Sequence, residues 1–365
     1  MITQEISKAG TSIWLDDLSR AKLAGDDPQS LPSRIANSGV VGVTTNPSIF
    51  NSAITGSADY AADIASMKSL SPEEIVKKLT TDDVRKACDL FASIYTQSSC
   101  VDGRVSIEVD PRLAHDTQNT ISEGKSLWQL VDRPNLLIKV PATKAGLPAI
   151  TELIASGISV NVTLIFSCQR YEEVIDAFIL GVEGAQKRGI NLSTIHSVAS
   201  FFVSRIDTSV DRKLKEINTQ ASLELLGKAA IANAVLAYEL FLTKSKSARW
   251  NKLGDAGAQM QRPLWASTGV KDPSYDDTRY VMDLIAPSTV NTMPQSTLDA
   301  VIDHGKFHGN TITPAIEHSH IALAQLSKNG ISLNDITEAL EIEGVASFAK
   351  AWQALLDDVD KVRNA

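Results

Sequence analysis

The chain is 365 residues long, and its content of 43% hydrophobic and 21% charged residues is typical of a folded globular protein and not of a disordered chain. Its formal net charge of −8 disfavours nucleic acid or an anionic membrane as a partner, because both require a basic face. An aromatic content of 5% also leaves few side chains for stacking on bases. We expect any anionic substrate to be held by a few local cations.

Cysteine usage and the N-terminal residues bear on the cellular compartment. The three cysteines, Cys88, Cys100 and Cys168, are odd in number and have no Cys-x-x-Cys spacing, so neither a disulfide framework nor a zinc site is expected. The N-terminal residues include no apolar signal segment, and no run of about 18 apolar residues occurs in the chain. These features predict a cytoplasmic protein.

Short apolar, β-branched runs alternate with longer segments of helical period, which predicts parallel strands joined by helices. Eight such units, with no Gly-x-Gly-x-x-Gly turn opening a helix, favour a closed (β/α)8 TIM barrel over an open doubly wound sheet. The strands are expected at residues 12–16, 40–45, 105–109, 136–140, 160–165, 194–199, 263–267 and 289–293.

Several helices between these strands have clear sequence signals. Ser71 begins a capping box with Glu74, and Ser332 begins a weaker cap. Residues 172–187 carry an apolar stripe at a spacing of four, and residues 207–249 should add helices between strands six and seven. The stripe consists of Val174, Phe178 and Val182.

The segment after the last predicted strand has a helical pattern. We expect residues 296–365 to form terminal helices, including residues 316–326 and 346–362, that pack on the barrel. No proline-rich linker, repeat or low-complexity segment separates them from the rest of the chain. The expected organisation is one domain over residues 1–365, with the barrel at about residues 10–295.

Polar and ionisable side chains gather where the predicted strands end, which is where the active sites of TIM barrels lie. A charge that faces the packed interior of a barrel is costly unless it is paired or used. The residues in question are Asp16, Asp17, Asn46, Glu108, Lys139, Asn161, Thr163 and Ser200.

Lys139 is the strongest candidate, because it ends an apolar strand and Pro141 follows closely. Burial there favours the free amine, which is the nucleophilic form that attacks a ketone. Asp16 and Glu108 would supply the proton transfers that carbon–carbon bond cleavage beside an iminium requires. The alternatives are a lysine that extends to the barrel rim and two carboxylates in structural salt bridges.

The uncharged candidates have structural alternatives too. Asn46 precedes Pro47, so it either caps a helix or donates a hydrogen bond to a substrate hydroxyl. Asn161 and Thr163 are two residues apart on a strand, which places both on one face, and that face is expected to be the interior.

Three polar residues, Ser200, Arg205 and Lys271, lie near strands six and seven, close to the region where TIM barrels often bind phosphate. Each has the alternative of an ordinary surface ion pair or hydrogen bond.

The histidines do not indicate a metal site, and no metal or organic cofactor is expected. His304, His308, His318 and His320 fall in the terminal segment without carboxylates at ligand spacing. His196 is expected within strand six as a satisfied interior residue. No Walker loop, Gly-x-Ser-x-Gly turn or zinc signature occurs.

Seven strings occur in order over residues 14–273, and together they resemble the successive motifs of the transaldolases, in particular the longer form found in bacteria. The strings are WLDDL, GVTTNPSIF, SIEVDPRLAHDT, LIKVPAT, NVTLIFS, SVASFFVSRID and LWASTGVKDP. The resemblance implies a TIM barrel that transfers a dihydroxyacetone unit between sugar phosphates without a cofactor. The sequence carries no signal for an oligomeric state.

The resemblance also implies roles for individual residues. Lys139 would form the Schiff base, and Asp16 would be the acid/base residue, although Asp17 beside it leaves a one-residue ambiguity. Glu108 and Thr163 would hold a water used in proton relay.

Substrate contacts follow from the same resemblance. Asn46 and Asn161 would orient the dihydroxyacetone moiety. The remaining predicted contacts, to substrate hydroxyls and phosphate, are Ser200, Phe202 and Arg205. Many relatives have an arginine soon after Ala-Ser at strand seven, whereas this chain has Lys271 slightly later, so the second phosphate contact departs from the family pattern.

Three rival functions remain open from the sequence. A fructose 6-phosphate aldolase shares the barrel and the lysine, but the resemblance places a glutamine where this chain has Glu108. A sugar-phosphate isomerase would use Asp16 and Glu108 but gives Lys139 no covalent task. A sugar-phosphate-binding barrel without catalysis is disfavoured by the intact lysine, carboxylates and asparagines.

Overall fold

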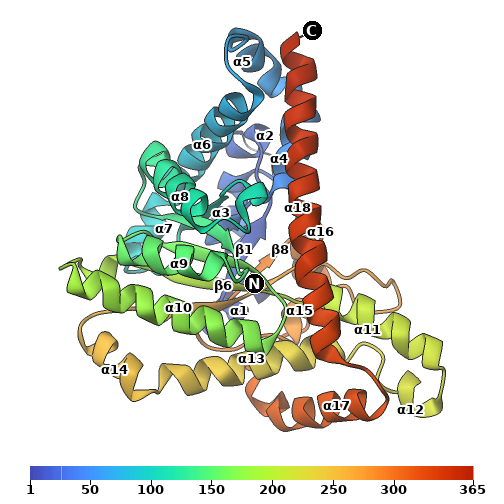
Figure 1. Ribbon diagram of the computed structural model, residues 1–365. Helices are drawn as coiled ribbons and strands as arrows, with labels where there is room; N and C mark the ends of the chain where they lie inside the picture. The colour runs from blue at the N-terminus through green and yellow to red at the C-terminus, as the bar shows by residue number, and fades with distance from the viewer. Residues whose placement is uncertain (26, 365) are drawn as a thin grey trace.

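The computed structural model describes residues 1–25 and 27–364, and its eight strands form a closed, fully parallel barrel in the chain order β1 to β8 (Figure 1). The predicted (β/α)8 barrel is thereby confirmed. The strands are β1 (Thr11–Asp16), β2 (Gly42–Thr44), β3 (Arg104–Glu108), β4 (Leu136–Pro141), β5 (Val160–Ile165), β6 (Ser197–Phe202), β7 (Arg262–Ala266) and β8 (Thr289–Met293).

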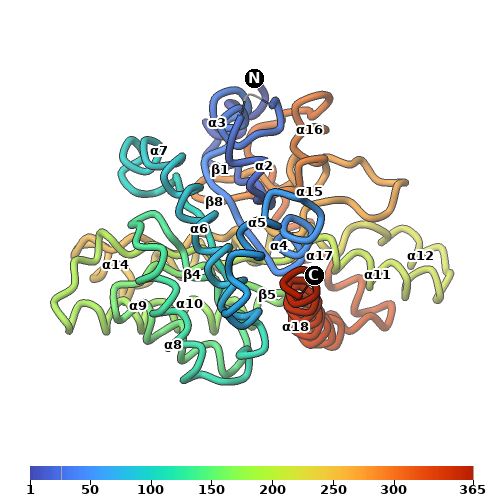
Figure 2. Tube along the Cα trace, turned by 90° about the horizontal axis from the view of Figure 1, so that it is seen from above, coloured from blue at the N-terminus to red at the C-terminus, as the bar shows by residue number. Residues whose placement is uncertain are grey.

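The helices lie around this barrel, mostly between consecutive strands (Figure 2). Those up to β5 are α1 (Ile2–Lys8), α2 (Arg20–Leu23), α3 (Leu31–Ser38), α4 (Pro47–Thr55), α5 (Ala61–Ser66), α6 (Pro72–Leu90), α7 (Ala92–Gln97), α8 (Thr117–Val131) and α9 (Gly146–Ala155). Those after β5 are α10 (Cys168–Lys187), α11 (Ser204–Ile217), α12 (Gln220–Leu223), α13 (Ala229–Ser245), α14 (Ala248–Asp255), α15 (Arg279–Met282), α16 (Gln295–His304), α17 (Ile316–Lys328) and α18 (Leu333–Asn364). Short 3-10 helices are η1 (Ala58–Tyr60), η2 (Pro111–Leu113), η3 (Leu192–Thr194) and η4 (Thr313–Ala315).

The predicted position of strand six was wrong by three residues. The segment before β6 forms η3, because Asn191 caps it through a hydrogen bond from Ser193 N to its Oδ1 at 3.1 Å. The strand then extends through the aromatic pair to Phe202. His196 therefore precedes β6 and does not lie within it. Strand two is also shorter than expected, since β2 covers only Gly42–Thr44.

The helices predicted from the sequence agree with the structure, except that the length of the last helix was underestimated. The capping box at Ser71 is present, with Ser71 N donating to Glu74 Oε2 at 2.8 Å and Glu74 N donating to Ser71 Oγ at 3.3 Å. The extra helices between strands six and seven are α11 to α14. The last helix was expected over residues 346–362, but α18 already begins at Leu333, where Ser332 Oγ accepts from Asp335 N at 3.3 Å.

Strands β2 to β6 and β8 are buried along their whole length, as expected for parallel strands that are covered on both faces. Trp14 and Trp265 are fully buried in the core. Gly42 allows the Trp14 indole to lie directly against β2, because a Cβ at this position would come within 2.6 Å of the ring. The register of the sheet pairs Leu15 with Val43 and Asp16 with Thr44, which brings the ends of β1 and β2 together at the site described below.

The long helix α18 packs lengthwise against α4, α6, α5 and α11 and also contacts the end of β5. It runs along one side of the molecule and ends near α5 (Figures 1 and 2). Residues from the end of the chain therefore reach the barrel mouth, far from the strands in sequence.

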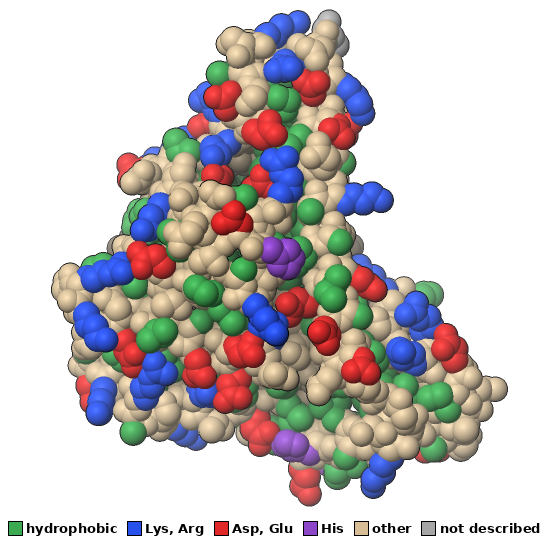
Figure 3. Space-filling view, in the orientation of Figure 1, with side chains coloured by type: hydrophobic (Ala, Val, Ile, Leu, Met, Phe, Trp, Pro, Cys, Tyr) green, Lys and Arg blue, Asp and Glu red, His purple; other side chains and the backbone are tan. Residues whose placement is uncertain are grey.

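Among the described residues, none of the helices has both the length and the apolar character needed to cross a membrane. On the face shown in Figure 3, basic and acidic side chains are interspersed over all the visible elements.

Candidate active site

A cavity of about 230 Å³ opens at the carboxyl ends of the barrel strands and contains most of the predicted site residues. Its walls come from strand ends, from the β7–α15 loop and from α18. The lining residues are Asp16, Thr44, Asn46, Ser48, Lys139, Thr163, Ser200, Phe202, Arg205, Ala266, Ser267, Gly269, Lys271, Thr292, Pro294, Ser347 and Phe348.

Lys139 lies on β4, and its side chain is 5% exposed. Its Nζ donates to the backbone oxygen of Thr45 at 2.9 Å and to Glu108 Oε2 at 3.2 Å. The pairing with Glu108 follows from the register of the sheet, which places these two residues opposite each other on β4 and β3. The amine therefore lies in a nearly dry pocket with one carboxylate as its ionic partner.

Glu108 is almost fully buried, and burial raises the pKa of its carboxyl to about 7 despite the opposing charge of Lys139. The nearby charge of Asp16 raises this pKa further. Glu108 Oε1 and Thr163 Oγ1 are both buried, and neither has a hydrogen-bond partner among the described residues. A carboxyl with a pKa near neutrality is suited to both accept and return a proton.

The geometry separates Asp16 from Asp17. Asp16 lines the cavity and accepts a hydrogen bond from Thr44 Oγ1 at 2.6 Å, its neighbour in the sheet register. Burial raises the pKa of Asp16, and the Lys139 charge and the Thr44 hydrogen bond partly offset that effect. Asp17 forms an ion pair with Lys22 and does not line the cavity.

Asn161 does not line the cavity but supports a residue that does. It is fully buried and accepts a hydrogen bond from Ser200 Oγ at 2.7 Å. Its amide donates to Ser106 Oγ on β3 at 3.0 Å. Because β3 and β5 are not neighbours, this bond spans the interior, so the expected inward orientation of Asn161 is confirmed.

Asn46 combines the two alternatives left open by the sequence. Its Oδ1 caps α4 by accepting from Ile49 N at 3.0 Å, and the residue also lines the cavity. The cap fixes the side chain and leaves its amide group as a donor for another partner.

The cations of the cavity are Lys139, Arg205 and Lys271. Arg205 stacks over Phe202, with its guanidinium carbon 5.3 Å from the ring centroid, and burial lowers the pKa of Arg205 while the charge of Glu343 opposes that effect. Lys271 is exposed at the rim. No hydrogen bond or ion pair to either side chain occurs within residues 1–25 and 27–364, so both are available to an anion.

Two residues of α18 complete the cavity, and sequence reasoning missed both. Ser347 and Phe348 line it, and Lys139 Nζ lies 5.3 Å from the centroid of the Phe348 ring. Thr292, whose hydroxyl lies 2.6 Å from that of Thr44, was also missed. Thr292 could have been predicted from the sequence, because this residue lies near the end of a predicted strand.

Comparison with known proteins agrees with this geometry. Residues 13–359 match the family model described as transaldolase/fructose-6-phosphate aldolase. The chain belongs to this family. It is 52% identical to a transaldolase of Thermobifida fusca over 358 residues, covering 98% of this chain and 96% of the relative. A transaldolase of Mycolicibacterium smegmatis is 54% identical over 354 residues, covering 96% of this chain and 95% of the relative.

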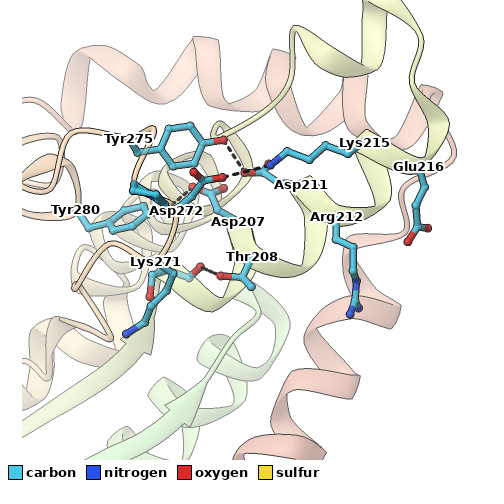
Figure 4. Close-up of a pocket in the computed structure, with 12 residues that line it drawn as sticks. Asp207, Thr208, Asp211, Arg212, Lys215, Glu216, Lys271, Asp272, Tyr275 and Tyr280 are labelled. Carbon is cyan, nitrogen blue, oxygen red and sulfur yellow. Dashed lines mark hydrogen bonds and ion pairs between the residues drawn. The ribbon is translucent and has the colours of Figure 1, made fainter.

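A larger cavity, of about 740 Å³, shares Lys271 with the site of this transaldolase-family chain. Figure 4 shows this cavity, with Lys271 among its lining residues. Its buried carboxylates are already bonded. Asp207 accepts from Ala230 N at 2.8 Å and from Tyr280 at 2.7 Å, and Asp211 accepts from Tyr275 at 2.7 Å. Its two lysines are unlike Lys139, because Lys215 pairs with Asp272 and Lys271 is exposed, so this cavity lacks the buried amine of the candidate site.

The histidines of the terminal segment are dispersed in this family member. His304 lies 2.8 Å from Asp277, and His320 lies 2.8 Å from Glu239. Within the described residues, no group of three or more His, Cys, Asp or Glu side chains is placed to hold a metal ion.

The raised pKa of Glu108 should make the stability of this family member depend on pH. Because the folded-state pKa, about 7, exceeds the usual 4.5, the folded protein binds more protons than the unfolded chain between these values. The stabilisation is therefore complete below about pH 4.5 and is lost as the pH rises through 7. We expect urea denaturation to show that wild type loses roughly 1–3 kcal/mol more than Glu108→Gln between about pH 5 and 8. Parallel stability curves would contradict the burial argument.

Proposed function

We propose that the chain is a transaldolase of the non-oxidative pentose phosphate pathway. It transfers a dihydroxyacetone unit from sedoheptulose 7-phosphate or fructose 6-phosphate to glyceraldehyde 3-phosphate or erythrose 4-phosphate, through a Schiff base on Lys139. The observation that carries this proposal is the buried Lys139 amine, 3.2 Å from Glu108 and in one cavity with Asp16. The names of relatives that are more than half identical support it.

The first chemical step uses Lys139 as the nucleophile. Its free amine attacks C2 of the ketose, and the carbinolamine loses water to give a protonated imine. Asp16 then takes the proton of the C4 hydroxyl, the C3–C4 bond breaks, and its electron pair moves into the imine to give an enamine. The aldose phosphate leaves, and the enamine stays on Lys139 until an acceptor aldehyde reverses these steps.

Water must leave and return during imine formation and hydrolysis, and we assign its proton transfers to Glu108. The unpartnered atoms Glu108 Oε1 and Thr163 Oγ1 are the groups that would hold such a water. The pKa of about 7 supports this role, because a relay residue must carry both protonation states near the working pH.

The substrate contacts follow from the same cavity. Asn46 and the pair Asn161–Ser200 would orient the hydroxyls of the dihydroxyacetone moiety, with Phe202 as a wall. Arg205 and Lys271 would hold the phosphate, since the part of the chain that the structure describes gives neither cation a partner. Lys271 would replace the arginine common at this strand in the family.

We also make proposals about the domain organisation, the cellular location and the partners of the protein. We propose that the barrel and residues 296–365 act as one domain, because α18 supplies Ser347 and Phe348 to the cavity. We propose a cytoplasmic location, where sugar phosphates are available. Partners other than sugar phosphates are not needed for the reaction.

The decisive experiment is borohydride reduction of the enzyme with fructose 6-phosphate, followed by peptide mass mapping. We expect a three-carbon adduct on Lys139 alone, because this lysine combines burial with a position in the cavity. An adduct on another lysine, or none, would overturn the Schiff-base assignment. The absence of any adduct would also favour the isomerase, which needs no covalent intermediate.

Transfer and aldol cleavage are separated by product analysis. With erythrose 4-phosphate present, a transaldolase forms sedoheptulose 7-phosphate, whereas a fructose 6-phosphate aldolase accumulates free dihydroxyacetone. We expect the transfer product to dominate.

A further inference from the structure

A second polar cavity, of about 220 Å³, lies at the opposite end of the barrel from Lys139. Its residues come from the beginnings of strands β3, β4, β6 and β7, and it shares none of them with the candidate active site. The lining residues are Val101, Arg104, Leu137, His196, Ser197, Val198, Phe241, Gln259, Met260, Arg262 and Ser288. Nothing in the proposed reaction uses them.

Arg104, the first residue of β3, is buried with 1% exposure. Its Nε and Nη2 donate to the backbone oxygen of Cys100 at 3.0 and 2.5 Å, and Nη1 donates to that of Pro134 at 3.3 Å. Over residues 1–25 and 27–364, no carboxylate lies within ion-pair distance of this guanidinium. Arg104 is therefore a buried cation whose hydrogen-bond partners are backbone carbonyl groups and whose guanidinium carbon lies 4.9 Å from the centroid of the Tyr95 ring.

Arg262, the first residue of β7, contributes a second guanidinium. Its Nη1 donates to Ser12 Oγ at 2.9 Å, and Nη2 donates to Val101 O and Asp102 Oδ1 at 3.0 Å each. A guanidinium has five N–H donors, and Arg104 and Arg262 each use them in three hydrogen bonds, so each has donors left for a further acceptor. Within the described part of the chain, the carboxylate of Asp102 forms an ion pair with Arg262 only, so the two guanidinium groups of the cavity are accompanied by one paired carboxylate.

His196 lies beside these cations, immediately before β6, and is 8% exposed. Its Nε2 is buried and has no hydrogen-bond partner among the described residues. Burial and the charges of Arg104 and Arg262 lower the pKa of His196 to about 3, so the ring is neutral at physiological pH. A neutral imidazole accepts one hydrogen bond and donates another.

The ligand that fits these groups is a small oxyanion. Uncompensated positive charge in a buried site is costly, and an anion relieves the repulsion between the two guanidinium groups. Guanidinium forks bind phosphate oxygens through charge-assisted hydrogen bonds, and a protonated phosphate oxygen satisfies the free nitrogen of a neutral imidazole. A cation would be repelled, and an apolar ligand would leave the remaining donors of the two guanidinium groups without an acceptor.

We propose that this cavity, lined by Arg104, His196 and Arg262, binds a phosphate-class oxyanion at the N-terminal end of the barrel, separately from substrate. The volume of about 220 Å³ accommodates either inorganic phosphate or a small phosphomonoester. The site is independent of the reaction at Lys139, so its test does not use activity.

The experiment follows the ring nitrogens of His196 by NMR while the intact protein is titrated with inorganic phosphate or with glycerol 3-phosphate. The latter has no carbonyl group and cannot react with Lys139. The ring-nitrogen signals that are absent from the spectrum of His196→Gln are thereby assigned to His196. We expect saturable shifts of the His196 signals and a rise in the pKa of His196 by at least about one unit, because a bound anion favours the imidazolium.

Two variants locate the anion. Arg262→Gln should weaken the binding reported by His196 by about tenfold or more, since it removes a charge-assisted fork. Lys271→Met removes a cation from the other end of the barrel and should leave that affinity within about twofold.

Shifts with phosphate alone, or with glycerol 3-phosphate alone, would each support the site and name the source of the oxyanion. No shift of His196 with either ligand, at concentrations on the order of 50 mM, would overturn the proposal, as would full retention of affinity in a folded Arg262→Gln. If Arg262→Gln does not fold, the wild-type titration decides alone.

Discussion

Lys139→Met should lower turnover to background, a loss on the order of 10⁴ to 10⁶, because the other lysine of the cavity, Lys271, is exposed at the rim and is not buried beside Glu108. Methionine keeps most of the volume of the lysine stem, so the core stays filled. The variant should also yield no adduct after borohydride reduction. Residual activity near wild type would rule out covalent catalysis at this lysine.

The folded state should survive this change for a reason specific to the site. Removing Lys139 takes away the ionic partner of Glu108, and breaking a buried ion pair normally costs several kcal/mol. Here the pKa of Glu108 is already about 7, so without the lysine charge its carboxyl becomes neutral at pH 7. We expect a stability loss of about 1–3 kcal/mol by urea denaturation, with normal circular dichroism.

Lys271→Met is the matched control, since it removes a lysine from the rim of the same cavity. It should raise KM for phosphorylated donors and still allow a full adduct on Lys139.

Asp16→Ala should separate adduct formation from bond cleavage. The variant should still form the trappable adduct on Lys139, because Asp16 acts only after the imine exists. Release of the aldose phosphate should fall by about 10² to 10⁴, the usual contribution of a positioned general base. Single-turnover trapping and a coupled assay for the aldose phosphate measure the two steps separately.

Asp17→Ala provides the comparison, because Asp17 pairs with Lys22 outside the cavity. It should change turnover by less than about threefold and stability by at most about 1 kcal/mol, as for a partly exposed ion pair. If Asp17→Ala were the inactive variant, Asp17 would be the acid/base residue, and the orientation assigned to the two carboxylates at the end of β1 would be wrong. If both Asp16→Ala and Asp17→Ala stayed active, neither carboxylate of β1 would be the acid/base residue.

The barrel was predictable because its strands are buried on both faces and read as short apolar runs between helical segments. Errors arose where local chemistry overrides that pattern. Residues 194–196 look like the start of a strand, yet Asn191 caps a 3-10 turn there and delays β6 to Ser197. For the last helix, Ser332 gave a cap signal, and Ile336 and Leu340 follow it at helical spacing. This helix was nevertheless expected only over residues 346–362, so the first turns of α18 were missed.

The site was predictable where its residues lie on strand ends, because a parallel barrel brings all those ends to one rim. Lys139, Asp16 and Glu108 could be placed on this ground, and their roles came from the family resemblance. Phe348 could not be placed, because helical periodicity identifies an apolar face without saying what it packs against. The two guanidinium groups at the other end of the barrel were missed because strand starts carry no comparable expectation.

The position of α18 at the end of the chain affects how the protein folds while it is synthesised on the ribosome. Translation runs from the N-terminus, so all eight strands are made before Ser347 and Phe348 exist. A nascent chain can therefore close its barrel before the part of α18 that lies over the Lys139 amine has been synthesised. In such an intermediate Lys139 would lack the Phe348 ring, which lies 5.3 Å from its Nζ in the folded protein, and docking of α18 then completes the wall of the cavity (Figure 1).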